Sequence, residues 1–311
     1  MPKTSSDPVR RTLNGPTMGT RWSVVFYAPA GADLGPLAAD LQTAVEEVDA
    51  QMSTWRPHSD LMRFNAAPVG AWQALPVRLL TVLDCALQIG RLSGGAFEIA
   101  MGDAVRAWGF GPVPADPQAI RTALGRTRRP SHETLELDLT AGRARKHAPM
   151  MLDLCGIAKG YGVDRLIDVL EAHGIAAALA SIDGELRAIG RQPDGRGWSV
   201  AVERPDPEAR APHSVFELHD TAIATSGDYR HRIAVGGRFL SHTMDPRRGG
   251  PVLGGPASAT VLAGSCMEAD ALASAFMVLG EDGKALAERI GVEVLLLGGP
   301  EAETSGTRGA A

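Results

Sequence analysis

Apolar residues recur at helical spacing in several parts of the 311-residue chain. Stripes with three- and four-residue spacing predict helices over 35–52, 77–92 and 157–173. A fourth helix is expected from Ser265, which has Glu268 three positions later as in a capping box, to Gly280. β-branched, aromatic or alternating runs predict strands over 22–28, 135–139, 197–203, 214–218, 232–235, 258–263 and 292–297, and a further apolar run covers 175–182.

Helices and strands are mixed without a strict alternation, which predicts an α+β fold rather than a doubly wound parallel sheet. Residues 1–15 and 299–311 are small, polar and aperiodic, so we expect a flexible N-terminus, one domain over 16–298 and a flexible C-terminal tail. Residues 112–131 are rich in proline and arginine and show no clear period. We expect this middle segment to be an excursion over the surface.

Composition excludes several classes of protein. With 44% hydrophobic and 22% charged residues, the chain is globular, and its net charge of −5 disfavours nucleic-acid binding. Three cysteines without a CxxC pair argue against a disulfide framework or a thiolate zinc site. No stretch of about 18 apolar residues and no leader-like segment occurs, so the expectation is a cytoplasmic protein without membrane contact. A leader preceding this sequence would make it periplasmic instead.

The usual nucleotide and hydrolase motifs are missing. The chain contains no GxGxxG, GxxxxGK[ST], GxSxG or HExxH. The Rossmann, P-loop, hydrolase and zincin interpretations therefore lack their signatures.

Residues 152–164 (LDLCGIAKGYGVD) place glycines and a lysine at the start of a predicted helix. Gly156, Gly160 and Gly162 allow a ligand to approach the backbone, while the helix N-terminus and Lys159 favour an anion. This combination suits a diphosphate. The alternative is a flexible junction between loop and helix with a solvated lysine.

Asp270 and Ser274 are four residues apart in the fourth predicted helix and so lie on one of its faces. Their oxygens suit Mg2+, which takes oxygen ligands and leaves room for substrate phosphates. The alternative is an aspartate favoured by the helix dipole and a serine tolerated between alanines.

His242 lies in a loop with several turn-forming and basic residues, residues 240–249 (LSHTMDPRRG), and a similar cluster occurs at 225–230 (TSGDYR). Such clusters are typical of functional loops. Each of the eight histidines is more often structural than catalytic, and only its neighbours distinguish His242.

Taken in order, these segments resemble the ApbE-type FAD:protein FMN transferase family. The resemblance extends from Met18 to Gly280. It rests on 18–20 (MGT), 52–55 (MSTW) with Pro57 and 63–65 (RFN), 153–164, 225–229 (TSGDY), His242 with Asp245, Pro246 and Gly249, and 269–274 (ADALAS).

The resemblance implies a bilobal α+β fold, with mixed or antiparallel sheets flanked by helices and an active site between the lobes. It also implies Mg2+-dependent cleavage of FAD, release of AMP, and transfer of FMN to a threonine or serine of an acceptor flavoprotein. His242 would act as the base, and Lys159 would balance charge on the departing AMP. The implied flavin nucleotide contacts are Met18, Trp55, Ala96, Phe97, Glu98, Asp153, Lys159 and Met244. The implied metal donors are the Gly156 carbonyl, Asp270 and Ser274, with Ala273 close by.

The chain departs from the family pattern at three places. Ser274 replaces the commoner threonine but keeps a hydroxyl, Glu98 and Ala100 replace Asp and Thr, and Asp183-Gly-Glu185 replaces Gly-Gly-Asp. Two other functions stay open, an Mg2+-dependent FAD pyrophosphatase and a non-catalytic FAD carrier. The first would release AMP and free FMN, and the second would hold FAD without releasing AMP.

Overall fold

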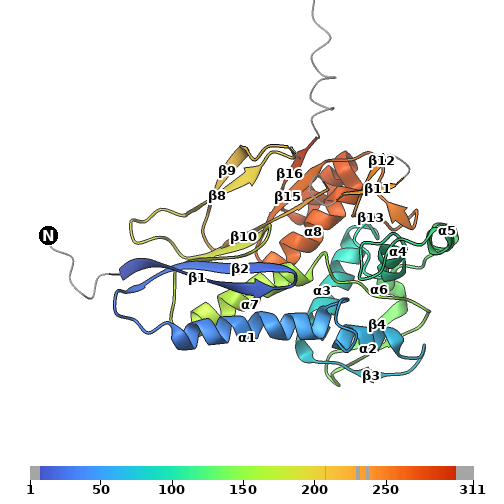
Figure 1. The fold of residues 1–311 in the computed structure, drawn as a ribbon, viewed down its shortest axis with the longest axis horizontal. Coiled ribbons are helices and arrows are strands. Elements are labelled where there is room, and N and C mark those ends of the chain that lie inside the picture. Colours follow the sequence, from blue (N-terminus) through green and yellow to red (C-terminus); the bar gives the residue numbers. More distant parts are fainter. Residues whose placement is uncertain (1–7, 207, 229–231, 236–237, 299–311) are drawn as a thin grey trace, which may run out of the picture.

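The computed structural model describes residues 8–298 apart from 207, 229–231 and 236–237. At its centre is a seven-stranded sheet in the order β1-β2-β6-β7-β10-β15-β16 (Figure 1). All six strand pairs are antiparallel, which confirms an α+β fold. The strands are β1 (Pro8–Thr17), β2 (Thr20–Pro29), β6 (Ala178–Ile182), β7 (Glu185–Ile189), β10 (Thr221–Gly227), β15 (Ser258–Ala263) and β16 (Glu293–Leu297).

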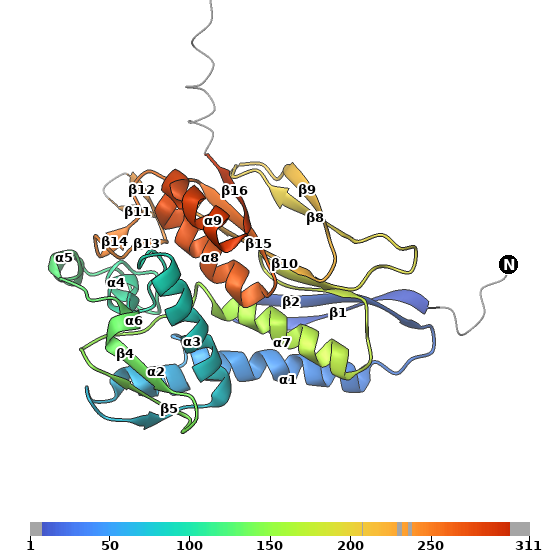
Figure 2. The ribbon, with the colours of Figure 1, turned by 180° about the vertical axis from the view of Figure 1, so that it is seen from behind.

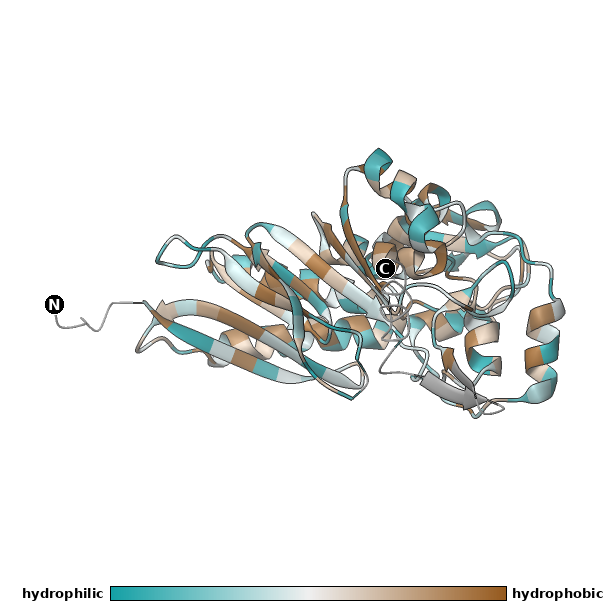
Figure 3. Ribbon diagram, turned by 90° about the horizontal axis from the view of Figure 1, so that it is seen from above, coloured by the Kyte–Doolittle hydropathy of each residue, from teal (hydrophilic) through white to brown (hydrophobic). Residues whose placement is uncertain are grey.

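Three helices cover one face of this sheet: α1 (Gly35–Met52), α7 (Ala158–Ala172) and α8 (Cys266–Leu279) (Figure 2). Alternate residues of β2, among them Trp22, Val24 and Phe26, point into the core between the sheet and these helices. Figure 3 shows the resulting alternation of hydrophobic and hydrophilic residues along the long strands.

The opposite face of the sheet is covered by a hairpin of β8 (Trp198–Glu203) and β9 (Pro212–Leu218). Trp198, Val200 and Val202 alternate along β8 and pack with Ile223 of β10 in a separate cluster. The sheet is therefore buried on both faces along part of its length.

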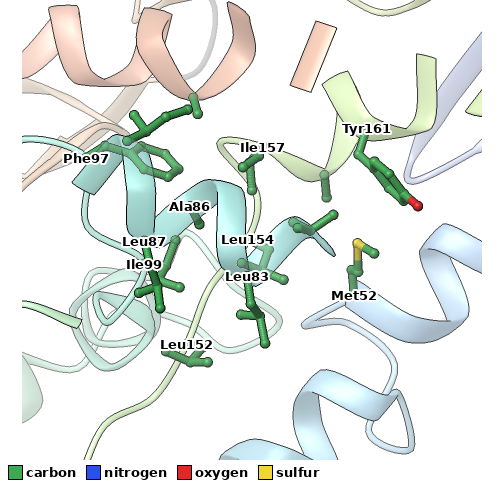
Figure 4. Close-up of a cluster of buried hydrophobic side chains, with 14 of the residues drawn as sticks. Met52, Leu83, Ala86, Leu87, Phe97, Ile99, Leu152, Leu154, Ile157 and Tyr161 are labelled. Carbon is green, nitrogen blue, oxygen red and sulfur yellow. The ribbon is translucent and has the colours of Figure 1, made fainter. Parts of the chain in front are cut away.

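A second group of elements lies beside the C-terminal end of α1 and the N-terminal end of α7, and packs against α8 (Figure 1). Its main core joins α3 to residues 97–99, 152–161 and α8 (Figure 4). The elements on this side are α2 (Asp60–Ala66), β3 (Gln73–Ala74), α3 (Val77–Leu92), α4 (Gly102–Ala107), α5 (Pro117–Gly125), α6 (Ser131–Thr134), β4 (Leu135–Asp138) and β5 (Arg143–Lys146). The other elements are β11 (Arg232–Val235), β12 (Arg238–Ser241), β13 (Met244–Asp245), β14 (Gly250–Pro251), the 3-10 helix η1 (Gly280–Gly283) and α9 (Lys284–Ile290).

Helices α7 and α8 approach closely at Gly160. A Cβ atom added there would lie 2.3 Å from the Cys266 carbonyl oxygen and 2.8 Å from Cβ of Asp270. Each helix also supplies a carboxylate to the other. Asp164 of α7 accepts from the backbone N–H groups of Cys266 and Met267, both at 2.9 Å, and Asp270 of α8 accepts from Gly160 N–H at 2.9 Å.

The predicted helices over 35–52, 77–92, 157–173 and 265–280 are confirmed, with Ser265 capping α8 through Glu268 N–H and Gly280 ending it. The predicted strands are confirmed within a few residues at each end. The expectation of a flexible N-terminus was wrong for residues 8–15. They form β1 and pair with β2 along its whole length, because an edge strand with an exposed face needs little apolar character.

The proline- and arginine-rich middle segment contains α5, which the lack of a period in the sequence did not predict. Residues 1–7 and the expected tail 299–311 lie outside the described residues. Among the described residues, no helix combines the length and the apolar character needed to cross a membrane.

Replacing Gly160 by alanine should force α7 and α8 apart, because the new methyl group would meet backbone atoms that cannot rotate away. We expect Gly160→Ala to lower the free energy of unfolding by about 1–3 kcal/mol, measured by urea denaturation. The control is Gly125→Ala, at the end of α5, where nothing lies within 4 Å of the added Cβ. Equal stability of the two variants would show that the helices do not depend on this approach.

Candidate active site at the start of helix α7

The predicted metal donors converge where α7 begins. A Cβ atom added to Gly156 would lie 2.8 Å from the Ser274 hydroxyl oxygen, so this glycine and α8 are in direct contact. Asp270 is one helical turn before Ser274 and accepts from Gly160 N–H. Ala273 is fully buried beside Ser274. The two segments that the sequence analysis joined through one ion are thus neighbours in space.

The donor set at this point consists of oxygen atoms: the Asp270 carboxylate, the Ser274 hydroxyl and the nearby Gly156 backbone. Ser226 of β10 adds a second hydroxyl, 3.3 Å from that of Ser274. No group of three or more His, Cys, Asp or Glu side chains that could hold a metal occurs among the described residues. One carboxylate with neutral oxygen donors, and with space kept free by a glycine, fits Mg2+ better than a transition metal.

Lys159 projects from the first turn of α7 into a pair of carboxylates. Its Nζ lies 3.0 Å from Glu185 Oε1 and 3.3 Å from Asp183 Oδ2, on either side of the β6–β7 turn. Burial opposes the charge on the ammonium, but the carboxylates of Glu185, Asp270 and Asp183 outweigh it and raise the pKa of Lys159. This lysine is therefore a permanent cation at the helix start.

Two of the three acidic groups around Lys159, Glu185 and Asp270, are buried, while Asp183 is exposed. Glu185 is 3% exposed, and its Oε2 atom has no hydrogen-bond partner among the described residues. Burial raises the pKa of Glu185 to about 8, although the attraction of Lys159 acts in the opposite direction. Burial likewise raises the pKa of Asp270 to about 6, against the effects of Lys159 and Gly160 N–H. Both carboxyl groups lie where a cation would lower their cost of ionisation.

Met18 reaches the same helix from the N-terminal hairpin. It occupies the β1–β2 turn with a φ of 44°, followed by Gly19 with a φ of 73°. A Cβ atom added to Gly162 would lie 2.9 Å from the terminal carbon of Met18, so the side chain rests on α7. The turn thus brings this predicted flavin contact close to Lys159.

A hollow of about 340 Å³ reaches Asp153, three residues before Gly156 in the chain. Trp55 and Asp153, both predicted flavin contacts, line it together with Thr54, Arg106 and Met151. The Trp55 side chain is 61% exposed, which is unusual for a large aromatic residue. Asp153 accepts from Cys155 N–H at 2.8 Å, and burial raises its pKa.

The predicted flavin contacts at residues 96–98 differ in what their side chains touch. The Phe97 ring lies 3.4 Å from the position of a Cβ on Gly156, so it borders the donor cluster, and Ala96 precedes it. Glu98 uses both carboxylate oxygens on backbone N–H groups, those of Ala100 at 2.7 Å and Ser131 at 2.8 Å. Its side chain holds the local fold and is not turned toward the hollow.

His242 and Met244 contact residues that adjoin the hollow but do not line it themselves. The His242 ring meets Phe110 edge-on, with centroids 6.4 Å apart, and Phe110 precedes Gly111 in the wall of the hollow. Met244 is buried in a cluster with Met101 and Ala104 of the α4 region. The structure thus places His242 against Phe110, next to the wall of the hollow, while Lys159 lies with Asp270 and Glu185 at the start of α7.

Three neighbours of the site were not among the predicted site residues: Asp183, Glu185 and Ser226. The first two appeared in the sequence only as a departure from a pattern. Lys159 and Glu185 are 26 positions apart, and only the β6–β7 hairpin beside α7 brings them together. The one signal in the sequence that pointed to these two residues was a glutamate directly after an aspartate-glycine pair.

Residues 18–296 match the sequence model of the ApbE family. The chain belongs to the ApbE family. This ApbE-family protein is 38% identical over 289 residues to the FAD:protein FMN transferase of Vibrio cholerae, covering 92% of this chain and 86% of that protein.

Two solved structures also resemble this ApbE-family protein. The flavin transferase ApbE from Vibrio cholerae superposes with a TM-score of 0.81 at 36% identity, covering 93% of this chain and 94% of that one. The flavinyl transferase ApbE of Pseudomonas stutzeri, in its apo form, gives a TM-score of 0.80 at 35% identity, covering 92% and 90%. The expected family and its fold are confirmed.

The raised pKa of Glu185 predicts how stability changes with pH. Between its ordinary pKa of 4.5 and about 8, the folded state keeps a proton that the unfolded state releases, so rising pH destabilises the fold. Glu185→Gln is neutral at all pH values and removes this effect. We expect its Tm to rise relative to that of the parent protein between pH 5 and pH 9, measured by thermal unfolding.

The control is Glu171→Gln at the exposed end of α7, whose Tm should follow the parent protein at every pH. A Tm difference for Glu185→Gln that stays constant from pH 5 to pH 9 would contradict the assignment of a buried proton to Glu185.

Proposed function

We propose that this protein transfers FMN from FAD to a threonine or serine hydroxyl of an acceptor flavoprotein, and that it releases AMP in a Mg2+-dependent reaction. The observation that carries the proposal is the meeting of Gly156, Lys159, Asp270 and Ser274 at the start of α7. A hollow lined by Trp55 and by Asp153, which precedes Gly156, supports it. The names of its relatives support the same reaction.

The start of α7 is suited to the FAD diphosphate. The helix N-terminus offers backbone N–H groups, and Lys159 supplies a fixed positive charge. Gly156, Asp270 and Ser274, with Ala273 beside them, would hold Mg2+, which supplies charge neutralisation at phosphate oxygens when bound. In this assignment, Lys159 stabilises the negative charge that develops on the departing AMP.

The hollow is suited to the rings of the flavin nucleotide. Trp55 offers an exposed flat face for stacking, and Asp153 offers a polar group on the same wall. Met18, Ala96, Phe97 and Met244 would contribute apolar contact around the nucleotide. Glu98 would act through its backbone, since its carboxylate is already hydrogen-bonded.

The acceptor hydroxyl would reach the FMN phosphorus from the side of the hollow where His242 lies. In the transfer, the hydroxyl oxygen bonds to that phosphorus while the bond from the phosphorus to the oxygen of AMP breaks. His242 would take the proton of the hydroxyl as a general base. Transfer of this kind depends mainly on positioning and charge neutralisation.

The proposal is tested by incubating the protein with FAD, Mg2+ and candidate flavoprotein domains from the same organism, followed by intact mass spectrometry. One domain should gain the mass of one FMN, with an equal amount of AMP released. Asp270→Asn can still accept from Gly160 N–H but lacks the charge, so we expect it to fold normally. Its labelling should fall by more than about 100-fold, because partners that only support metal ligands already contribute about 10–100-fold.

Release of AMP and free FMN without a labelled domain would identify a pyrophosphatase instead. Binding of FAD without release of AMP would identify a carrier. Labelling by Asp270→Asn within a few-fold of the parent protein would remove Asp270 from the metal site.

His242→Ala should bind FAD as tightly as the parent protein, measured by quenching of flavin fluorescence, because the imidazole acts on the acceptor and not on FAD. We expect labelling to slow by about 10²–10⁴-fold, the usual contribution of a general base. Phe110→Leu is the control, since it changes the ring beside His242 without removing the imidazole. Unchanged labelling by His242→Ala would assign the proton to another group.

A further inference from the structure

An arginine-rich surface lies next to the hollow on a protein whose net charge is −5. Between Arg106 and Arg129 the sequence has five arginines and a single aspartate, Asp116. This stretch runs from α4 through α5, at the end of the molecule farthest from β1 (Figure 1).

The β13–β14 hairpin adds further arginines to the same surface. A Cβ atom added to Gly249 would lie 2.3 Å from the Ala123 carbonyl oxygen, and one added to Gly250 would lie 3.0 Å from the Leu124 side chain. The turn of the hairpin therefore packs directly on α5. Arg247 and Arg248 of this turn are exposed beside the helix.

Acidic residues neutralise only part of this surface. Asp103 pairs with Arg126 at 3.0 Å and with Arg128 at 2.7 Å, Asp245 pairs with Arg247, and Glu133 lies 3.6 Å from Arg129. Three further arginines are exposed and form no ion pair with any residue that the structure describes. These are Arg106, Arg121 and Arg248.

Apolar side chains are exposed on the same surface. Leu124 of α5 is 47% exposed, and Leu253, which follows β14, is 56% exposed. Arginines mixed with exposed apolar residues are typical of protein interfaces. The surface also adjoins the reaction centre, because Arg106 lines the hollow and His242 contacts Phe110, which follows α4.

We propose that α5 and the β13–β14 hairpin form the docking surface for the acceptor protein, and that this surface binds acidic residues around the acceptor hydroxyl. The proposal rests on the proposed transfer reaction and adds the chemistry of its protein substrate. The positive charge of this docking surface attracts an acidic partner and orients its hydroxyl toward His242. The arginines of this surface are not needed to bind the diphosphate of FAD, because Lys159 and the start of α7 are assigned to it.

The test compares two double charge reversals, with the domain that the parent protein labels as the acceptor probe. Arg121→Glu with Arg248→Glu changes the proposed surface without touching the walls of the hollow. Arg10→Glu with Arg204→Glu is the matched control, at exposed positions on β1 and directly after β8. Thermal unfolding confirms that both variants fold.

For the surface variant at low salt, we expect kcat/KM for the acceptor to fall by about tenfold or more through a higher KM. The difference should shrink in about 0.5 M NaCl, where charges are screened within about 5 Å. FAD affinity, measured by quenching of flavin fluorescence, should not change. The control variant should match the parent protein, and Arg121→Gln with Arg248→Gln should show a smaller loss in the same direction.

Three results would overturn the proposal. The surface variant could match the parent protein at every salt concentration, or it could lose affinity for FAD instead of for the acceptor. It could also leave acceptor kinetics unchanged while losing binding to anionic phosphatidylserine vesicles, which would assign the surface to a membrane. A parent protein that labels no domain at all would refute the transfer reaction itself, which separates the two failures.

Discussion

The close crossing of α7 and α8 is the constraint on which the site depends. Gly160 lets the two helices touch, and each helix donates backbone N–H groups to a carboxylate of the other. The exchange fixes both rotation and sliding, because Asp164 and Asp270 lie at different heights along the crossing. Lys159 and Ser274 take their positions from this crossing, and Gly156 lies in the turn that leads into α7.

This arrangement makes Asp270 both a structural and a chemical group. Its carboxylate accepts from Gly160 N–H, lies near Lys159 and is buried, so its ionised form depends on surrounding positive charge. Glu185 is in a similar position, with one oxygen on Lys159 and the other without a partner among the described residues. Asp183 holds a backbone φ of 55° beside the same lysine, a conformation that costs energy in a non-glycine residue. The three carboxylates around Lys159 therefore cost folding free energy and gather charge at the start of α7.

Much of the fold could be predicted from the sequence, because helices such as α1 and α3 carry long apolar stripes that end at clear signals. The edge strand β1 and the helix α5 were missed, since each has an exposed polar face and little buried surface of its own. At the site, the sequence predicted that Gly156, Asp270 and Ser274 lie together, and the structure places these residues next to one another at the start of α7. Asp183 and Glu185 were not predicted as partners of Lys159, because their proximity comes from a hairpin and not from sequence distance. The hydrogen bond that Glu98 accepts from Ser131 N–H could not be predicted for the same reason, since the two residues are 33 positions apart.

Met18 of the first hairpin packs on Gly162 of α7, 144 positions away, and Asp270 of the last long helix accepts from Gly160 N–H of α7, 110 positions away. Contacts of such long range form late, because the entropy of closing a large loop must be overcome before they add stability. The site is therefore among the last parts of the molecule to be completed during folding. A half-folded intermediate would have no partial version of this arrangement.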